Sequence, residues 1–313
     1  MSHTAIGVGL GRFDDGLPEP SALFEYVDRA DELGIDSIWM PDHPISERPA
    51  LDPTVLQAVI AARTRDVKMG PSVLTLPARN PVAVANAYAT LDYLTGGRER
   101  VIVALGLGAE PRLTEAIGVP ADERAGRLRE GLQVIRRLWT EDAVDYDGEY
   151  YSLEGVSATP KPPSGPLDVW IGGNSEAAMR RVAAHGDGWF PARMPPSTFA
   201  AKLDRLMDYC DEAGRTVERD EAGVIVPTYV HPDDDRTEAV RERYLDRLDG
   251  DVDVDPATLD RCTALGTAAE CVDTIQRYVD AGCTKFVLMP AGPADEAVAQ
   301  LETYAADVIP AFD

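Results

Sequence analysis

The 313-residue chain has very little lysine, few cysteines and no long apolar run. Only four of its 30 basic residues are lysine, against 54 acidic residues, and the formal net charge is −24. An acidic balance of this size disfavours nucleic acid and anionic membranes, so we expect neither as a partner. No apolar stretch reaches the roughly 20 residues that a membrane span requires. The N-terminus has no basic, signal-like region, which predicts a cytoplasmic protein.

The scarce cysteines give no sign of a metal site. They are Cys210, Cys262, Cys271 and Cys283. No two of them form a CxxC pair, and none has a histidine at zinc spacing, so we expect buried, reduced thiols and no metal centre. Acidic residues recur along the whole chain, a composition that resembles proteins of salt-in halophiles. Because the Debye length is only about 3 Å in 1 M salt, such a protein would be shielded from its own charge, and we expect a haloarchaeal source.

Short apolar runs alternate with helical patterns along the chain. Eight runs are typical of buried strands, at residues 6–10, 37–40, 67–76, 100–105, 167–171, 188–191, 222–230 and 285–289. Helical periodicity lies at 21–33, 53–63, 81–94, 121–140, 175–184, 197–213, 237–248, 268–281 and 295–309. This alternation without a linker predicts a single (β/α)8 TIM barrel over residues 1–313 rather than a doubly wound sheet.

The alternation of strands and helices is interrupted once, after the fourth predicted strand. We predict an insertion there, at about residues 141–166. It contains a small hairpin that turns at Asp147–Gly148, because an Asp-Gly pair between strand-like runs favours a tight turn.

Polar residues and glycines stand where several of the predicted strands end. In a barrel these ends face the active site. The stretch Asp36-Ser-Ile-Trp-Met-Pro-Asp-His43 is a buried strand that runs into Asp42 and His43. His43 is the one histidine at such an end, and an imidazole can give or take a proton near neutral pH. The alternative is that Asp42 caps a helix and His43 has no function.

Two glycine-rich segments also follow predicted strands. Gly172-Gly173-Asn174-Ser175 opens a helix, so its backbone N–H groups suit a phosphate; the alternative is an ordinary capped helix start with Asn174 or Ser175 as the N-cap. Gly106-Leu107-Gly108 is not a dinucleotide-binding fingerprint, since Pro111 stands where the third glycine belongs. The residues alone predict a barrel enzyme that binds something phosphorylated.

Together the motifs resemble the luciferase-like superfamily of flavin- and deazaflavin-dependent oxidoreductases. The resemblance covers nearly the whole chain. Besides the segment around Asp42 and His43, it rests on Met69-Gly-Pro-Ser-Val-Leu-Thr75, Arg79-Asn-Pro81, Leu91-Asp-Tyr-Leu-Thr-Gly-Gly-Arg98, Arg127-Leu-Arg-Glu-Gly-Leu132, Tyr146-Asp-Gly-Glu-Tyr-Tyr151 and Val169-Trp-Ile-Gly-Gly173. Members of this superfamily are TIM barrels with an insertion after strand 4.

The likeness is strongest to the branch that uses coenzyme F420, and it implies a set of cofactor-binding positions. In that branch a non-prolyl cis peptide backs the deazaflavin ring, which corresponds to the bond between Ser72 and Val73. The implied cofactor contacts are Asp42, His43, Ser72, Val73, Thr75, Gly106, Leu107, Gly108, Gly172, Gly173 and Asn174. The implied catalytic residues are His43 and, as a second proton-transfer group, Glu110.

The resemblance therefore implies a hydride transfer between F420 and a small organic substrate, by a chain that is commonly a homodimer. A sugar phosphate is not expected as the substrate, because lysines are scarce and Glu110 lies one residue later than in the sugar-phosphate dehydrogenases. One alternative is an FMN-dependent monooxygenase on the same fold. The other is a non-catalytic flavin-binding member of the family.

Overall fold

The structure is a computed structural model that describes residues 4–10, 13, 16–43, 49–108, 111–248 and 256–312. Its strands are β1 Ala5–Gly9, β2 Ser37–Met40, β3 Lys68–Pro71, β4 Leu74–Thr75, β5 Val103–Gly106, β6 Val144–Asp147, β7 Ser152–Val156, β8 Val169–Gly172, β9 Gly188–Phe190, β10 Gly223–Val230, β11 Ala264–Gly266 and β12 Lys285–Pro290. Its helices are α1 Pro20–Glu32, α2 Pro53–Arg63, α3 Pro81–Leu94, α4 Pro111–Glu115, α5 Arg124–Thr140, α6 Glu176–His185, α7 Pro196–Ala213, α8 Asp234–Leu248, α9 Pro256–Asp260, α10 Ala268–Asp280 and α11 Ala297–Thr303.

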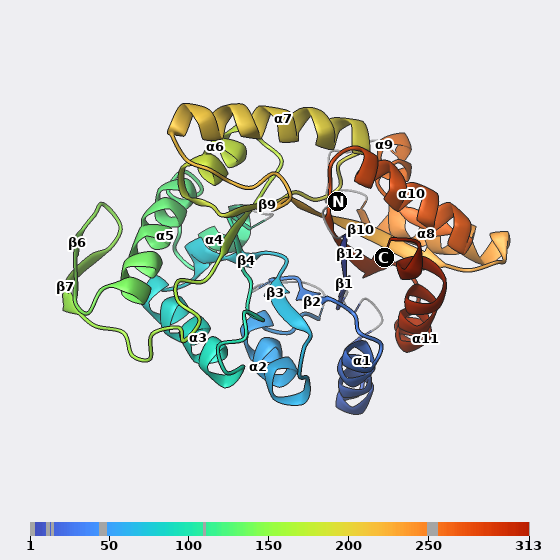
Figure 1. The fold of residues 1–313 in the computed structure, drawn as a ribbon, viewed down its shortest axis with the longest axis horizontal. Helices are drawn as coiled ribbons and strands as arrows, with labels where there is room; N and C mark the ends of the chain where they lie inside the picture. The colour runs from blue at the N-terminus through green and yellow to red at the C-terminus, as the bar shows by residue number, and fades with distance from the viewer. Residues whose placement is uncertain are drawn as a thin grey trace.

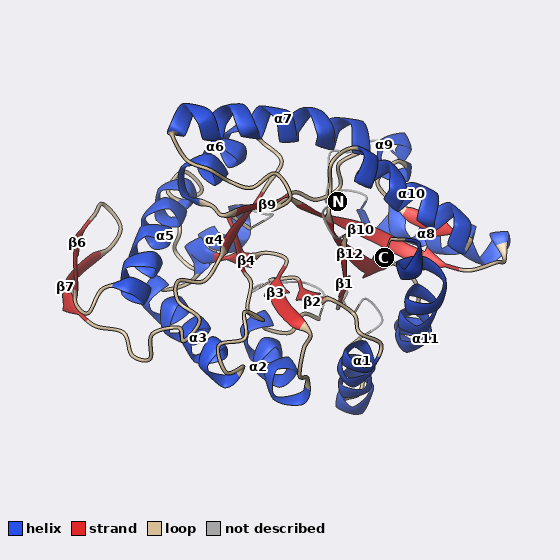
Figure 2. Cartoon of the chain, in the orientation of Figure 1, coloured by secondary structure: helices blue, strands red, loops and turns tan. Residues whose placement is uncertain are grey.

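The parallel strands form a barrel that is enclosed by helices (Figures 1 and 2). One sheet has the order β11-β10-β12-β1-β2-β3 and a second has the order β4-β5-β8-β9. Isolated bridges join the two sheets, from Met69 to Val101 on one side and from Trp189 to Ala222 on the other. Since β3 and β4 are two halves of one strand position, the described residues give eight positions around the barrel. The predicted (β/α)8 barrel is confirmed.

Aromatic rings fill the inside of the barrel. Trp39 of β2 lies with its ring centroid 4.7 Å from that of Phe190 and 6.1 Å from that of Trp170. The strands beside β2 carry glycine at Gly7 and Gly70, where a Cβ atom would come within about 3 Å of the Trp39 ring. Large rings at some positions and glycines at others keep the interior at close packing. These rings form the floor on which the site is built.

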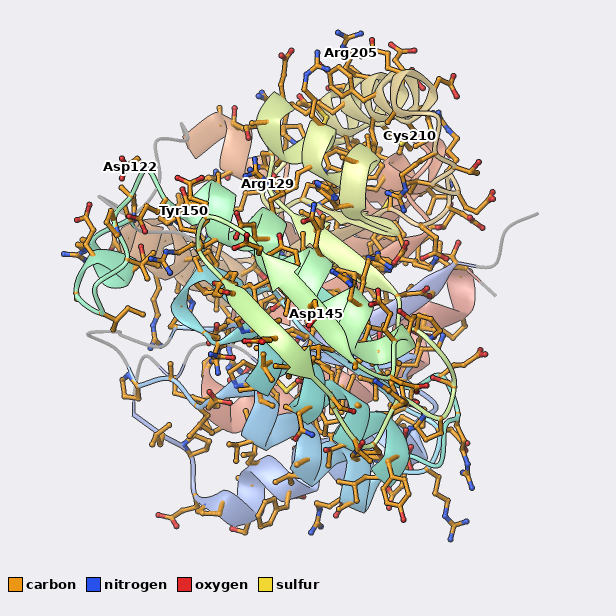
Figure 3. The ribbon with its side chains drawn as sticks, turned by 90° about the vertical axis from the view of Figure 1, so that its left-hand side faces the viewer. Asp122, Arg129, Asp145, Tyr150, Arg205 and Cys210 are labelled. Carbon is orange, nitrogen blue, oxygen red and sulfur yellow. The ribbon has the colours of Figure 1, made fainter. Side chains whose placement is uncertain are left out.

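The insertion after the fourth strand position is present as the antiparallel β6–β7 hairpin, which projects from the barrel beside α5 (Figure 1). Figure 3 views the molecule from this side, with Asp145 and Tyr150 on the insertion. The predicted turn at Asp147–Gly148 is wrong, because Asp147 pairs with Ser152 and the turn spans residues 148–151. The buried carboxylate of Glu130 on α5 accepts hydrogen bonds from the backbone N–H groups of residues 149–151, which holds this longer turn.

Several other boundaries also differ from those expected. The strand predicted at 67–76 is divided into β3 and β4, and the short strand β11 was not predicted; it pairs with the end of β10. The helix expected at 295–309 is α-helical only over α11, because a wider π-type turn follows at Tyr304–Val308. All four cysteines are buried and free, as expected. No described helix has both the length and the apolar character needed to cross a membrane.

Candidate active site

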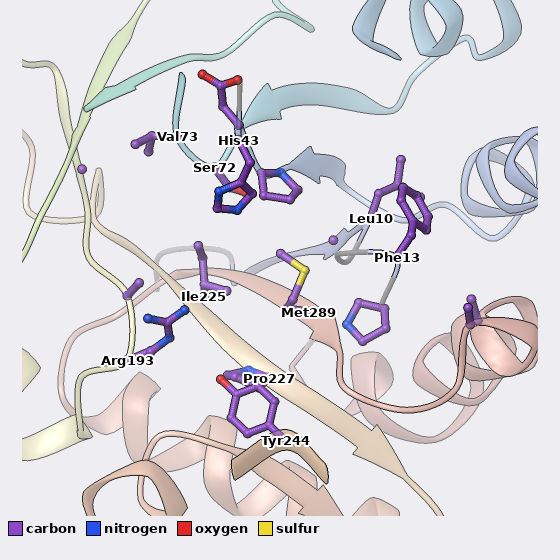
Figure 4. A pocket seen from close by; sticks show the side chains of 18 of the residues that line it. Leu10, Phe13, His43, Ser72, Val73, Arg193, Ile225, Pro227, Tyr244 and Met289 are labelled. Carbon is purple, nitrogen blue, oxygen red and sulfur yellow. The ribbon is translucent and has the colours of Figure 1, made fainter. Parts of the chain in front are cut away.

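A cavity of about 700 Å³ opens where the barrel strands end (Figure 4). The ends of β1, β2, β4, β5, β8, β9 and β12 all contribute to its wall. Ten of the residues predicted from the sequence line it, namely Asp42, His43, Ser72, Val73, Thr75, Gly106, Leu107, Gly108, Gly172 and Gly173. The fold therefore brings most of the predicted site together in one place.

Two predicted residues are not part of this wall as described. Asn174 does not line the cavity. Its amide group instead donates to the carbonyl oxygen of Ala192 at 2.6 Å and accepts from the backbone N–H of Ala192 at 3.2 Å, so it ties the end of β8 to the end of β9. Glu110 lies outside the described residues, and its role stays a prediction.

The carboxylate of Asp42 is hydrogen-bonded within the protein. Its side chain is 1% exposed. One carboxylate oxygen accepts the backbone N–H of Thr75 at 2.7 Å, and the other accepts a hydrogen bond from Arg79 at 2.8 Å. Arg79 also pairs with Asp52 at 2.9 Å. Burial works against the charged form of Arg79, but the two carboxylates outweigh it and raise the pKa of the guanidinium. Asp42 thus links the end of β2 to β4 and fixes the backbone position of the adjacent His43.

His43 enters the cavity from this fixed point. Its side chain is half-buried, and Figure 4 shows it beside Ser72, directed into the open space. The other two described histidines, His185 and His231, do not line the cavity. His43 is therefore the imidazole that can reach a molecule bound there.

The peptide bond between Ser72 and Val73 is cis, as the resemblance implied. It places the Val73 side chain over two glycines: a Cβ atom at Gly106 would lie 2.4 Å from Val73 Cγ2, and one at Gly172 would lie 2.9 Å from Val73 Cγ1. The glycines at these strand ends thus make room for Val73, a structural reason that sequence patterns did not reveal. Ser72 Oγ is buried and has no hydrogen-bond partner among the described residues.

The loop after β5 is held in place by contacts with neighbouring residues. Gly108 has a φ of +81°, and a Cβ atom there would lie 2.7 Å from Thr75 Cγ2. Arg124, at the start of α5, donates hydrogen bonds to the carbonyl oxygens of Leu107 and Gly108 at 2.7 and 2.5 Å. Arg124 therefore positions this part of the wall without lining the cavity.

Arginines on the wall were missed by the sequence analysis. Arg181 of α6, Arg193 after β9 and Arg243 of α8 all line the cavity. In the described part of the chain, neither Arg181 nor Arg193 has a carboxylate partner, although many surface arginines do, such as Arg241 with Asp260. Burial lowers the pKa of Arg181. A half-buried cation without a partner favours an anionic ligand. Arg193 follows a predicted strand end and could have been found by that rule, whereas the direction of Arg181 on its helix could not.

Arg181 belongs to α6, the helix that begins just after the glycine-rich segment. Gly172, Gly173, Ser175 and Ala178 line the same cavity as Arg181. Ser175 caps α6 by accepting the backbone N–H of Ala178, so the capped-helix alternative is correct for Ser175. The positive end of α6 and the guanidinium of Arg181 together suit a phosphate group.

In the described residues, no cluster of three or more histidine, cysteine or carboxylate side chains is placed to hold a metal ion.

Comparison with known proteins adds independent information. The sequence model described as "luciferase-like monooxygenase" matches residues 3–285. The F420-dependent glucose-6-phosphate dehydrogenase of Amycolatopsis mediterranei is 29% identical, over 93% of this chain and 94% of that protein. Among solved structures, an F420-dependent secondary alcohol dehydrogenase in complex with an F420-acetone adduct superposes with a TM-score of 0.85 at 22% identity, over the whole of both chains. The oxygenating constituent of 3,6-diketocamphane monooxygenase from Pseudomonas putida, in complex with FMN, gives a TM-score of 0.82 at 18% identity, over 98% of both chains.

Proposed function

This chain belongs to the luciferase-like monooxygenase family, and within it we propose that the protein is an oxidoreductase that uses coenzyme F420 to transfer hydride to or from a small organic substrate. The observation that carries the proposal is the layout of the cavity. The cavity is lined by His43, by the apolar side chains of Val73, Ile225 and Met289, and by Arg181 together with the glycines at the strand ends. Relatives across nearly the full chain are named as F420-dependent enzymes, which supports F420 over FMN.

The residues present fit such a cofactor. Val73 and its two glycine neighbours offer an apolar surface for a flat ring, and the buried Ser72 Oγ has a free hydrogen-bonding capacity beside it. When bound, the deazaflavin supplies the carbon that accepts or gives up hydride. The protein holds and orients it.

The anionic tail of the cofactor is expected at Arg181. No described carboxylate neutralises this guanidinium, and its burial disfavours the charged form, so a phosphate there would satisfy it. A charge-assisted hydrogen bond contributes about 1.5–3 kcal/mol. Arg181→Met should therefore weaken F420 binding roughly 10- to 150-fold. Arg180→Met is the matched control, because Arg180 is exposed on the same helix and does not line the cavity.

His43 is expected to manage the proton that accompanies hydride transfer. It is the histidine that lines the described cavity, and the Asp42–Thr75 hydrogen bond fixes the backbone from which it projects. General acid–base catalysis contributes about 10²- to 10⁴-fold in rate. His43→Ala should then reduce kcat at least 100-fold with little change in the Kd for F420. Glu110 remains a second proposed proton-transfer group.

The decisive experiment titrates the protein with F420 and with FMN and follows quenching of the fluorescence of each cofactor. Saturable F420 binding that Arg181→Met weakens and Arg180→Met does not supports the proposal. Tight FMN binding without F420 binding would refute it in favour of the FMN-dependent monooxygenase. F420 binding with no turnover of any alcohol or carbonyl compound would favour the non-catalytic alternative.

We further propose that the chain is one domain over residues 1–313, acts in the cytoplasm as a homodimer and binds no nucleic acid. The strand order supports one domain, since β1 pairs with both β2 and β12. The exposed Val55, Tyr93 and Leu94 on the neighbouring helices α2 and α3 support a dimer. Light scattering after gel filtration measures the oligomer: Tyr93→Glu should shift a dimer towards monomer.

A further inference from the structure

Arg193 lies on the cavity wall in a strained backbone conformation. Its φ is +52°, and among the other described residues that are not glycine only Glu99 has a positive φ. This left-handed conformation is disfavoured for an arginine by a factor of about 5 to 30, so it persists only where the surrounding structure enforces it. Figure 4 shows the Arg193 side chain directed into the open space beside Ile225. The strained residue is therefore one that can reach a bound molecule.

The residues on either side of Arg193 are each held by a side chain from another part of the chain. The amide group of Asn174 donates to the carbonyl oxygen of Ala192 at 2.6 Å and accepts the backbone N–H of Ala192 at 3.2 Å. The hydroxyl group of Tyr278 on α10 donates to the carbonyl oxygen of Met194 at 2.7 Å. Tyr278 is fully buried and Met194 is 2% exposed, so this second contact is shielded from water. Because both neighbours are fixed, the turn has to be made at Arg193.

A glycine would make this turn without strain. The walls of the same cavity already contain glycines in such conformations, at Gly108 with φ +81° and Gly173 with φ +129°. Arg193 bears the strain instead, and its half-buried guanidinium has no carboxylate partner among the described residues. A cation that is fixed in a cavity without a counter-charge is stabilised by an anionic ligand. The guanidinium therefore indicates a binding role for this position.

Given the F420-dependent function proposed above, on which this inference rests, we propose that Arg193 binds an anionic group in the cavity, a phosphate or a carboxylate, and that Asn174 and Tyr278 are its positioning residues. Because the turn is fixed before the ligand arrives, less conformational freedom is lost on binding. Asn174, expected from the sequence to touch the cofactor, acts through Arg193. The anionic group belongs either to the cofactor or to a second molecule bound beside it.

Arg193→Met tests the anionic ligand and its source. Two probes are titrated by fluorescence quenching at fixed ionic strength: F420, and its deazaflavin chromophore without the phosphate-bearing tail. Inorganic phosphate is titrated by ³¹P NMR into the cofactor-free protein and into the F420-loaded protein. A charge-assisted hydrogen bond corresponds to roughly 10- to 150-fold in affinity, so the variant should weaken binding of the probe that carries the anion by about that factor. Binding of the chromophore alone should not change.

Asn174→Ala and Tyr278→Phe test the positioning. Without the Asn174 contact Arg193 can relax, so Asn174→Ala should raise the same Kd by about 5- to 30-fold, and Tyr278→Phe should raise it less. In the Arg193→Met background neither change should have a further effect, a result that a purely structural role would not produce. Tyr304→Phe is the matched control, because the buried Tyr304 hydroxyl donates to the carbonyl oxygen of Thr228 at 3.1 Å, away from this turn.

The strain is measured separately by urea unfolding. Arg193→Gly and Arg193→Ala both remove the guanidinium, but only glycine takes a φ of +52° without strain. Arg193→Gly should therefore have the higher urea midpoint, and Asn174→Ala should reduce the difference. Arg180 of α6 is the control: in an ordinary helix Arg180→Gly should have the lower midpoint than Arg180→Ala.

The outcomes separate this inference from the proposed function. Weaker binding of F420 but not of the chromophore supports an anion on the cofactor, and loss of inorganic phosphate from the F420-loaded protein alone supports an anion on a second molecule. Unchanged binding of every probe in Arg193→Met would overturn the binding role. An added effect of Asn174→Ala in that background, or a midpoint for Arg193→Ala at least as high as for Arg193→Gly, would overturn the positioning. If F420 does not bind at all, the phosphate titration of the cofactor-free protein still decides: binding that Arg193→Met removes supports the inference, and no binding to the wild type overturns it.

Discussion

Neutralising Asp42 should destabilise the protein by about 2–3 kcal/mol, because its carboxylate is a buried charge with specific partners. The side chain is 1% exposed and accepts hydrogen bonds from Thr75 and Arg79 at 2.7 and 2.8 Å. Asp42→Asn keeps an oxygen for the Thr75 N–H but removes the charge that faces Arg79. Since Arg79 keeps Asp52 at 2.9 Å, we place the loss below the 3–5 kcal/mol typical of a broken buried pair.

The reciprocal change should cost more. Arg79→Met leaves Asp42 buried with one backbone N–H and no counter-charge, so we expect about 3–5 kcal/mol. If the two residues stabilise each other, the double variant should be less unstable than the sum of the single variants. The coupling energy should be about 1–3 kcal/mol.

Urea unfolding at fixed ionic strength, followed by fluorescence of the buried Trp39 and Trp170, measures these energies. The matched control is the exposed pair Arg219 and Asp204, joined at 2.6 Å with side chains 51% and 70% exposed. Its coupling should stay below about 1 kcal/mol. A coupling between Asp42 and Arg79 no larger than that of the control would refute the reasoning, and the end of β2 would then be held by packing alone.

Three further changes test other parts of the structure. Gly108→Ala should cost about 1–3 kcal/mol in urea unfolding, since a non-glycine residue at φ +81° is strained and its Cβ would meet Thr75. Arg124→Gln should weaken F420 binding severalfold in the fluorescence titration while kcat at saturating cofactor changes little, because it frees the loop after β5. Burial and nearby arginines lower the pKa of His185, so the unfolded state takes up its proton first and stability falls as pH drops below about 6.5; urea unfolding between pH 7.5 and 5.5 should show a smaller fall for His185→Gln.

The barrel could be predicted because its signal is repeated. Each buried parallel strand is a short apolar run, and each is followed by a helical pattern, so eight weak signals support one another. The predictions that failed concerned local features of the chain. The strand β11 has three residues, Ala264–Gly266, too few for any period to show. The hairpin turn was set by Glu130, a residue on a helix that precedes it, and no local turn rule includes such a contact.

The site residues likewise divide into those that the sequence could predict and those that it could not. His43 and the glycines could be found because strand ends meet at one mouth of a barrel. Arg181 could not, because a helix surface offers many directions and only the packed structure shows which one faces the cavity. The glycines were predicted for an incomplete reason. Gly172 was expected to suit a phosphate and Gly106 was implied by the resemblance as a cofactor contact, yet the structure shows both making room for Val73. The sequence pattern thus predicted glycines that line the cavity, but not the contact with Val73 that requires them.

The net charge of the protein and the charges inside its cavity lead to different conclusions about which anions it can bind. A formal charge of −24 argues against large polyanions, whose many phosphates would meet the whole acidic surface. It does not argue against one small anionic cofactor, because surface repulsion beyond about 3 Å is screened in molar salt, whereas Arg181 would act at contact distance from a half-buried position. Two arginines without described carboxylate partners, in a chain with 54 acidic residues, therefore carry more information about function than the composition does.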